Sequence, residues 1–260
     1  MSGTDLFGIE GKVALVTGGT SGIGEMAVRA LADAGARVYL TSRKAAACAE
    51  VAMRIADQIG ASVHGIVADL SLEDECLRLA AELGEREPRL HVLVNSAGAV
   101  WAEPLESFPV AAWHKVLDLN LVAPFVLTRA LLPRLAAAAT PDDPARVINV
   151  GSVDGFRPPA MPTFSYSASK AGLHQLTRVL AVELGARGVT VNAIAPGPFP
   201  SRMMAVTLQQ HQREYVATTP LRRIGTPEDI AGVVGFLSGR GGAFVTGAII
   251  PVDGGWSLRV

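Results

Sequence analysis

The segment Val13-Ala14-Leu15-Val16-Thr17-Gly18-Gly19-Thr20-Ser21-Gly22-Ile23-Gly24 joins a run of apolar residues to a glycine-rich turn. Residues 25–32 follow directly, and their apolar positions have the spacing of one helix face. A strand, a glycine turn and a helix in this order point the free N–H groups and the positive dipole end of the helix at a bound anion. The segment therefore predicts a phosphate-binding turn in a nucleotide site.

The glycines are spaced G-x-x-x-G-x-G, which differs from the common dinucleotide motif G-x-G-x-x-G. No Lys-Ser/Thr pair closes the motif, so a P-loop is not indicated. A glycine-rich loop that only connects a strand to a helix is the plain alternative. In the nucleotide interpretation, the turn residues that bind the cofactor are Gly18, Thr20, Ser21, Gly22, Ile23 and Gly24.

Composition indicates a packed globular enzyme. Of the 260 residues, 49% are hydrophobic and 18% are charged, and the net charge is −1. A dispersed charge of this size argues against a nucleic-acid-binding protein. Cys48 and Cys76 form neither a metal-ligand spacing nor a disulfide framework, and we expect no metal. The first eleven residues lack signal-peptide character and no long apolar run is present, so we expect a cytoplasmic protein without a membrane span.

Strand-like and helix-like segments alternate along the whole chain. This alternation predicts an α/β fold, a single-domain doubly wound parallel sheet, over residues 1–260. The expected strands are 12–17, 37–42, 62–68, 91–95, 146–150, 189–195 and 248–251. The expected helices are 22–34, 45–59, 72–83, 109–117, 120–138, 165–185, 201–218 and 227–237. Ligands bind outside the carboxyl ends of the strands of such sheets, so polar residues that follow strands become candidate site residues.

The second and third strands end in residues suited to the adenosine half of a dinucleotide. An NAD enzyme would place a carboxylate after the second strand, to bind the ribose 2′-OH. This chain has Ser42 and Arg43 there, and Arg43 can pair with a 2′-phosphate, which favours NADP over NAD. After the third strand come Asp69 and Leu70. Asp69 could bind the adenine amino group or cap the next helix.

The fourth strand ends in Asn95, Ala97 and Gly98, small residues that would pass beneath a nucleotide. Asn120 follows in an apolar stretch, where an amide needs a hydrogen-bond partner. It could be catalytic or only structural.

Ser152 follows the fifth strand, at the edge of the sheet where ligands bind. Tyr166 and Lys170 are four residues apart and would share one helix face. A neighbouring ammonium is expected to lower the pKa of a tyrosine, which could then give a proton to a carbonyl oxygen. Taken alone, the Tyr-x-x-x-Lys pattern is also common on solvated helices.

These motifs together resemble the short-chain dehydrogenase/reductase family, from about residue 12 to residue 255. The matching residues are Thr17, Gly18, Gly22, Ile23, Gly24, Asn95, Ala97, Gly98, Asn120, Ser152, Tyr166, Lys170, Pro196 and Gly197. The resemblance implies a Rossmann-type fold with strand order 3-2-1-4-5-6-7. Within the family the chain is most similar to NADP-dependent 3-oxoacyl (β-ketoacyl) reductases of the rhamnolipid type.

The resemblance also implies roles for four residues. Tyr166 would be the general acid or base, and Lys170 would hold the nicotinamide ribose and tune Tyr166. Ser152 would bind the substrate carbonyl, and Asn120 would hold a water that links Lys170 to solvent.

The chain departs from the family pattern at Ser96, where a second Asn is usual, and at Ser21, where many NADP enzymes have a basic residue. The NADP preference therefore depends mostly on Arg43. Pro196 and Gly197 are kept. We expect Ser201, with the N–H of Phe199, to take the place of the Thr that the family usually has near the nicotinamide carboxamide.

Largely apolar segments are expected to wall the substrate pocket, as would suit an acyl chain. The pocket residues expected are Trp101, Ser152, Asp154, Phe156, Met203 and Met204. Trp101, Phe156 and Met204 could equally pack against one another or a neighbouring subunit. Residues 201–219 are expected to form a mobile flap over the site.

Helices 120–138 and 165–185 are apolar on more than one face, and the family commonly pairs these helices in a homotetramer. An acyl carrier protein is a further expected partner, with Arg129, Arg202 and Lys115 as candidate contacts.

Three functions remain open from the sequence. The first is reduction by NADPH of a 3-oxoacyl thioester on an acyl carrier protein or coenzyme A, with Tyr166 as the proton donor. The second is an alcohol dehydrogenase of the same family, acting on a sugar, steroid or small alcohol. The third is a non-catalytic dinucleotide-binding module, against which the complete set of Asn120, Ser152, Tyr166 and Lys170 argues.

Overall fold

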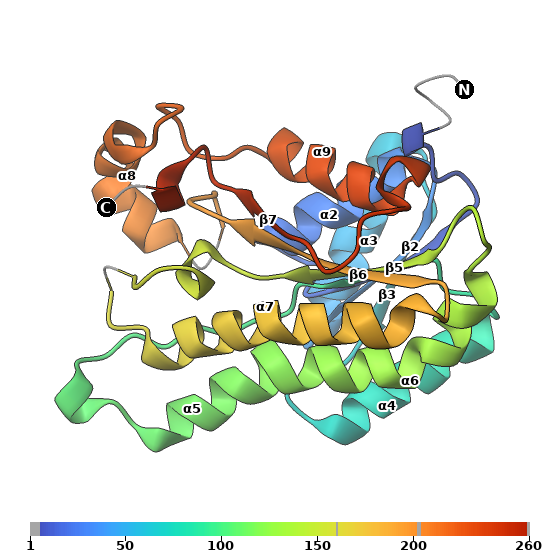
Figure 1. Ribbon diagram of the computed structural model, residues 1–260, viewed down its shortest axis with the longest axis horizontal. Coiled ribbons are helices and arrows are strands. Elements are labelled where there is room, and N and C mark those ends of the chain that lie inside the picture. The colour runs from blue at the N-terminus through green and yellow to red at the C-terminus, as the bar shows by residue number, and fades with distance from the viewer. Residues whose placement is uncertain (1–5, 160, 202–203, 259–260) are drawn as a thin grey trace.

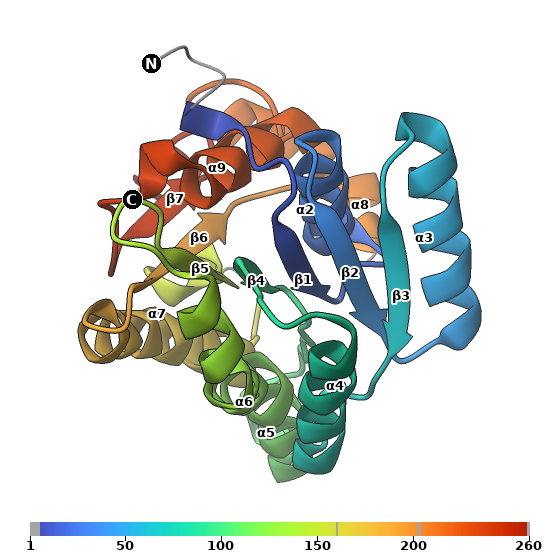
Figure 2. The same cartoon turned by 90° about the vertical axis from the view of Figure 1, so that its right-hand side faces the viewer.

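The computed structural model describes residues 6–159, 161–201 and 204–258. A parallel sheet of seven strands lies between two layers of helices (Figures 1 and 2). In sequence order the strands are β1 (Val13–Thr17), β2 (Arg37–Ser42), β3 (Val63–Val67), β4 (Val92–Asn95), β5 (Ala145–Val150), β6 (Val189–Pro196) and β7 (Ile249–Val252). Their order in the sheet is β3-β2-β1-β4-β5-β6-β7, which confirms the predicted Rossmann-type topology.

The helices are divided between the two faces of the sheet. One layer contains α2 (Gly22–Asp33), α3 (Ala45–Ile59) and α9 (Pro227–Ser238). The other contains α4 (Glu73–Arg86), α5 (Val110–Leu117), α6 (Ala123–Ala138) and α7 (Phe164–Gly185). The remaining helix, α8 (Ala205–Thr218), lies apart at the end of the sheet on the left of Figure 1.

Both faces of the sheet are buried, because apolar side chains project from each strand in both directions. In β1, Ala14 and Val16 pack in one core with α2, α3 and α9, and Val13 and Leu15 pack in the other with α4, α6 and α7. All five residues of β1 are buried. This explains why the strand is a continuous apolar run rather than an alternating one.

The expected helices 109–117 and 120–138 are joined in the structure. A π-helical turn, Asp118–Val122, connects α5 to α6 without a loop. Asn120 lies in this turn with 1% of its surface exposed. π-turns inside α-helices are frequent at functional sites, and the periodicity of an apolar stretch does not reveal one.

The span Val110–Ala138 is long and apolar enough to cross a membrane, with a mean hydropathy of 1.5. In the structure it belongs to a packed helix layer, where α6 contacts α4 and α5 contacts α7. The span therefore fits a core helix of a soluble protein.

Candidate active site

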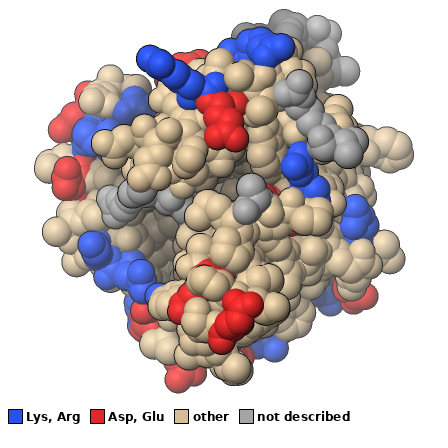
Figure 3. Space-filling view, turned by 90° about the vertical axis from the view of Figure 1, so that its left-hand side faces the viewer, with Lys and Arg blue, Asp and Glu red and all other residues tan. Residues whose placement is uncertain are grey.

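The register of the sheet brings the carboxyl ends of four strands to one edge. Thr17 of β1 ends beside β4, Asn95 pairs with Asn149 of β5, and Val150 pairs with Ile194 of β6. A cavity of about 640 Å³ lies at this edge. Figure 3 shows the corresponding face of the molecule, with a hollow in it and basic and acidic side chains around it in small, mixed groups.

The glycine turn forms one wall of the cavity and packs too tightly for side chains. A Cβ on Gly24 would lie 2.3 Å from the carbonyl oxygen of Gly18, and a Cβ on Gly18 would lie 2.8 Å from the Cα of Ala97. Gly18 and Gly22 also have positive φ values of 65° and 55°. Ser21, the N-cap of α2, makes no side-chain cap, so the first N–H groups of this helix are available to an anion. This arrangement fits the pyrophosphate of a dinucleotide.

Thr17 fixes the loop after β4. Its hydroxyl oxygen accepts hydrogen bonds from the backbone N–H groups of Ser96, at 2.9 Å, and Ala97, at 3.0 Å. The serine at position 96 therefore does not leave the loop without support. Ser96, Ala97 and Gly98 all line the cavity.

The far end of the cavity is basic. Ser42, Arg43 and Lys44, at the end of β2 and the start of α3, line it together with Ala68 and Leu70. No carboxylate lines this end within the described chain. The donor set fits a 2′-phosphate on the adenosine ribose better than a free 2′-OH, which a carboxylate would bind.

Two residues expected to bind the cofactor lie outside the cavity lining. Asp69 accepts hydrogen bonds at its Oδ1 from both the backbone N and the hydroxyl of Ser71, so it forms a turn before α4. Asn95 donates from its amide to Asn149 Oδ1 at 2.9 Å. Neither lines the cavity, although their neighbours Leu70 and Ala97 do. The physical reason is that each side chain is taken up by bonds within the protein.

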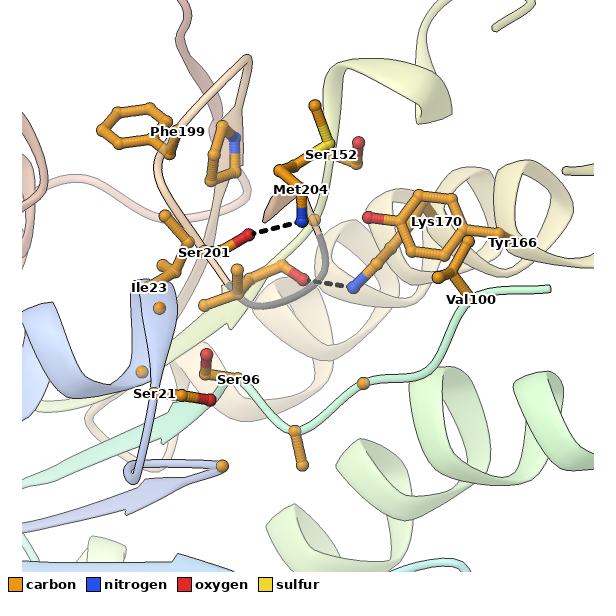
Figure 4. A pocket seen from close by; sticks show the side chains of 18 of the residues that line it. Ser21, Ile23, Ser96, Val100, Ser152, Tyr166, Lys170, Phe199, Ser201 and Met204 are labelled. Carbon is orange, nitrogen blue, oxygen red and sulfur yellow. Dashed lines mark hydrogen bonds between the residues drawn. The ribbon is translucent and has the colours of Figure 1, made fainter. Parts of the chain in front are cut away.

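Ser152, Tyr166 and Lys170 lie together at the other end of the cavity (Figure 4). The Ser152 hydroxyl accepts a hydrogen bond from the backbone N–H of Asp154 at 3.1 Å, which holds it at the N-cap of a short 3₁₀ turn, Val153–Gly155. Lys170 Nζ donates to the carbonyl oxygen of Val150 at 2.7 Å and lies 5.5 Å from the centre of the Tyr166 ring.

The pKa of Tyr166 differs from the sequence expectation. Burial raises the pKa of the phenol to about 12, a hydrogen bond with Ser152 opposes the rise, and the charge of Asp154 adds to it. Burial lowers the pKa of Lys170 to about 8. The predicted lowering of the tyrosine pKa was wrong, because burial of the phenol is the largest influence on it and acts in the opposite direction. Tyr166 therefore keeps its proton at neutral pH and can donate it.

The Asn120 side chain is fully bonded inside the protein. Its amide donates to the Ala99 carbonyl at 2.9 Å and to Ser169 Oγ at 3.0 Å, and its oxygen accepts from Ala99 N at 2.8 Å. These bonds tie the loop after β4 to α7. A Cβ on Gly98 would lie 3.3 Å from Asn120 Oδ1 and 3.9 Å from Lys170 Nζ, so the amide lies close beneath the site.

The loop after β6 closes the end of the cavity where the nicotinamide is expected. Pro196, Gly197, Phe199 and Ser201 all line it, as expected. Phe199 is 3% exposed and is held by Gly225, where a Cβ would come within 2.2 Å of the ring. The Ser201 hydroxyl oxygen accepts a bond from Met204 N at 3.1 Å (Figure 4).

The structure brings some of the expected substrate-pocket residues to the cavity and leaves others away from it. Ser152, Asp154 and Met204 line it, and Met203 lies outside the described residues. Trp101 instead donates to Glu103 at 3.0 Å and lies under Lys115, and Phe156 packs on His174 with a ring separation of 4.7 Å. Both aromatic side chains therefore pack within the chain, on residues other than one another and Met204.

Residues of α8, within the expected flap 201–219, line the cavity together with the C-terminal segment, and two aromatic residues there were not singled out from the sequence. Tyr215 and Trp256 line the cavity, with their rings 6.1 Å apart. The Arg157 guanidinium lies 4.7 Å from the Trp256 ring centre and so connects the loop before α7 to the C-terminal segment. No local motif marks these residues, because they meet only through the tertiary fold.

The fold and the site define a nucleotide-dependent oxidoreductase, and the chain belongs to the short-chain dehydrogenase/reductase family. The matching family model, described as enoyl-(acyl carrier protein) reductase, covers residues 18–257. The chain is 45% identical to the rhamnolipids biosynthesis 3-oxoacyl-[acyl-carrier-protein] reductase of Pseudomonas aeruginosa, over 97% of this chain and 98% of that protein.

Two further comparisons extend this result. A solved complex of RhlG with NADP from Pseudomonas aeruginosa has a TM-score of 0.93 and 45% identity, and the match covers 97% of this chain and 99% of that chain. Galactitol 2-dehydrogenase (L-tagatose-forming) of Cereibacter sphaeroides is 37% identical over 97% of this chain and 98% of its own length.

Proposed function

We propose that this protein reduces the ketone of a 3-oxoacyl thioester to a secondary alcohol with NADPH. The observation that carries the proposal is one continuous cavity. It has two cations, Arg43 and Lys44, at one end and Ser152, Tyr166 and Lys170 at the other. A dinucleotide with a 2′-phosphate spans such a cavity and brings its nicotinamide to the tyrosine.

The glycine turn and the start of α2 would hold the pyrophosphate, and Lys170 would hold the nicotinamide ribose. Its ammonium has three N–H donors, of which Val150 occupies one. Asn120, Gly98 and Asn149 would act by fixing the loops around the nucleotide. When bound, NADPH supplies the hydride.

Ser152 and Tyr166 would bind the substrate carbonyl oxygen and thereby place the ketone beside the nicotinamide. Tyr166 then gives its proton to that oxygen as negative charge develops on it. A phenol that holds its proton at neutral pH is in the protonation state that this step requires. A relay of water molecules from Lys170 past Asn120 would restore the proton of Tyr166. Because the Asn120 side-chain amide is fully bonded within the protein, other atoms would hold these waters.

The largely apolar wall of the substrate end supports an acyl substrate. Its residues include Val100, Ala102, Met161, Met204 and Trp256. The relative from Pseudomonas aeruginosa, named for a 3-oxoacyl-[acyl-carrier-protein] substrate, supports the same class. An acyl carrier protein or coenzyme A would carry the thioester.

The second candidate is an alcohol dehydrogenase for a sugar or polyol. The galactitol 2-dehydrogenase relative favours it, as does the one carboxylate, Asp154, among the described residues of the cavity wall. A carboxylate can accept hydrogen bonds from substrate hydroxyl groups.

A cofactor-oxidation screen tests both candidates. We expect acetoacetyl and longer 3-oxoacyl thioesters to be reduced with NADPH, with kcat/KM well above that for simple ketones and hexuloses. Efficient NAD-dependent oxidation of polyols, with no thioester reduction, would instead establish the second candidate.

Replacement of Arg43 by Ala tests the cofactor assignment. Loss of a charge-assisted contact to the 2′-phosphate is expected to cost about 1.5–3 kcal/mol, so NADPH affinity should fall roughly 10- to 100-fold and NADH affinity hardly at all. Arg178→Ala on α7, which does not line the cavity, is the matched control. Equal losses for both nucleotides would exclude a 2′-phosphate contact.

A further inference from the structure

The carboxylate of Asp154 has no hydrogen-bond or ion-pair partner among the residues that the structure describes. It lines the cavity in the turn Val153–Gly155, two residues after Ser152. The Ser152 hydroxyl accepts the Asp154 backbone N–H, which fixes the position of the residue. A charged group kept near the reacting carbonyl without a structural partner is free to act on a substrate.

The surroundings of Asp154 make its charge effective. It is the one acidic residue among the described lining of the cavity, and the neighbouring wall is largely apolar. Its charge reaches the phenols of Tyr166 and Tyr215 and raises the pKa of both, in addition to the effect of their burial. Coulombic effects are strongest where little water screens them.

The charge of Arg157 acts on Asp154 and lowers the pKa of its carboxyl, but the raising effect of burial is larger. The Arg157 guanidinium lies over the Trp256 ring and donates to the Trp256 carbonyl at 3.4 Å, and it does not line the cavity. Lys170 bonds to the Val150 carbonyl. The substrate end of the cavity is therefore expected to disfavour an anion.

We propose that Asp154 determines substrate specificity, because its carboxylate repels an anionic group close to the reacting ketone. It would select the neutral 3-oxoacyl thioester over the corresponding free 3-oxo acid. This inference rests on the proposed reduction of a 3-oxoacyl thioester. The charge would let a pocket with an apolar wall discriminate against free 3-oxo acids that have the same acyl chain as the thioester.

The test compares one neutral and one anionic substrate that share their ketone. We would measure kcat/KM with NADPH at pH 8 for S-acetoacetyl-N-acetylcysteamine and for acetoacetate. The proteins would be the wild type, Asp154→Asn and the charge-retaining Asp154→Glu. Glu183→Gln, an exposed change on α7, is the control.

We expect Asp154→Asn to raise kcat/KM for acetoacetate at least tenfold and to change that for the thioester less than about threefold. Asp154→Glu should keep the wild-type preference, because it keeps the charge. Equal changes for both substrates in Asp154→Asn, or no gain on acetoacetate, would overturn the inference.

Calorimetry on the wild-type protein loaded with NADPH gives a second readout that needs neither turnover nor a variant. Butyramide should bind at least tenfold more tightly than butyrate, and equal or tighter binding of butyrate would overturn the inference. Failure of the proposed function would look different, since the wild type would then not reduce the thioester at all, whatever the butyramide and butyrate affinities.

Discussion

Tyr166 is a partly buried phenol that keeps its proton, and its hydroxyl is the group that changes protonation in the proposed reaction. Tyr166→Phe removes this hydroxyl and leaves the ring that packs beside Lys170. We expect kcat to fall by about 10²–10⁴-fold, the usual contribution of a general acid, with nucleotide affinity within about threefold. Stopped-flow turnover and NADPH fluorescence titration measure the two effects. Turnover close to wild type would remove Tyr166 from the mechanism.

His174 is a second buried group at this site, one helical turn beyond Lys170. It is 3% exposed, its Nε2 has no partner among the described residues, and Gly151 and Gly155 leave the space that its ring occupies. Burial, followed by the charges of Lys170 and Arg178, lowers the pKa of its imidazole to about 4. The folded protein therefore contains neutral His174 over a wide pH range.

The titration of His174 should be visible in the pH dependence of the free energy of unfolding. The unfolded chain binds a proton at His174 near pH 6.5 and the folded chain only near pH 4, so stability is lost as the pH falls through this window. The loss from this one group is about 3 kcal/mol. Urea unfolding of wild type and His174→Gln from pH 7 to pH 4 measures it. We expect a shallower dependence in the variant, and identical slopes would contradict the assigned pKa.

At the scale of the element, α2 illustrates why glycine is needed at one position in a helix and not at another. Gly24, in the first turn of α2, meets the Gly18 carbonyl, whereas a Cβ on Gly232, in the middle of α9, would meet no atom within 4 Å. The same substitution should therefore have opposite effects in the two helices.

Gly24→Ala should destabilise the protein by about 1–3 kcal/mol and weaken nucleotide binding, because α2 must move away from β1. Gly232→Ala should stabilise it by roughly 0.5–1 kcal/mol, since alanine restricts the unfolded chain. Thermal unfolding with and without NADPH measures both. A Gly24→Ala protein as stable as wild type would show that the turn can relax.

On the surface of the molecule, apolar side chains are exposed on the helix layer formed by α5, α6 and α7. Val182 is 86% exposed and Val179 is 53% exposed on α7, and Phe125 is 40% exposed on α6. Exposed apolar side chains gathered on one face are typical of association sites. We propose that these helices pair in a homotetramer, which would bury the exposed side chains.

Val182→Arg places a charge in the proposed interface and should dissociate the tetramer, because an unpaired charge is costly to bury. Met53→Arg on α3, where the methionine is 63% exposed, is the control and should leave the assembly unchanged. Light scattering measures the mass of each variant. A monomeric wild type would disprove the tetramer.

The sheet, the glycine turn and the set of Ser152, Tyr166 and Lys170 could be predicted from the amino-acid sequence. These features follow from local rules: apolar runs form buried strands, glycines permit positive φ, and residues four apart share a helix face. The order of the strands then placed their carboxyl ends at one edge.

Which side chains face the cavity, and which of them are protonated, could not be predicted in this way, because both depend on the tertiary structure. Asp69, Asn95, Trp101 and Phe156 were expected in the site and have partners elsewhere, whereas Tyr215 and Trp256 reach it from the far end of the chain. The pKa of Tyr166 also rose rather than fell. Burial and hydrogen-bond partners depend on contacts between distant segments, and these contacts cannot be predicted from the local spacing of residues.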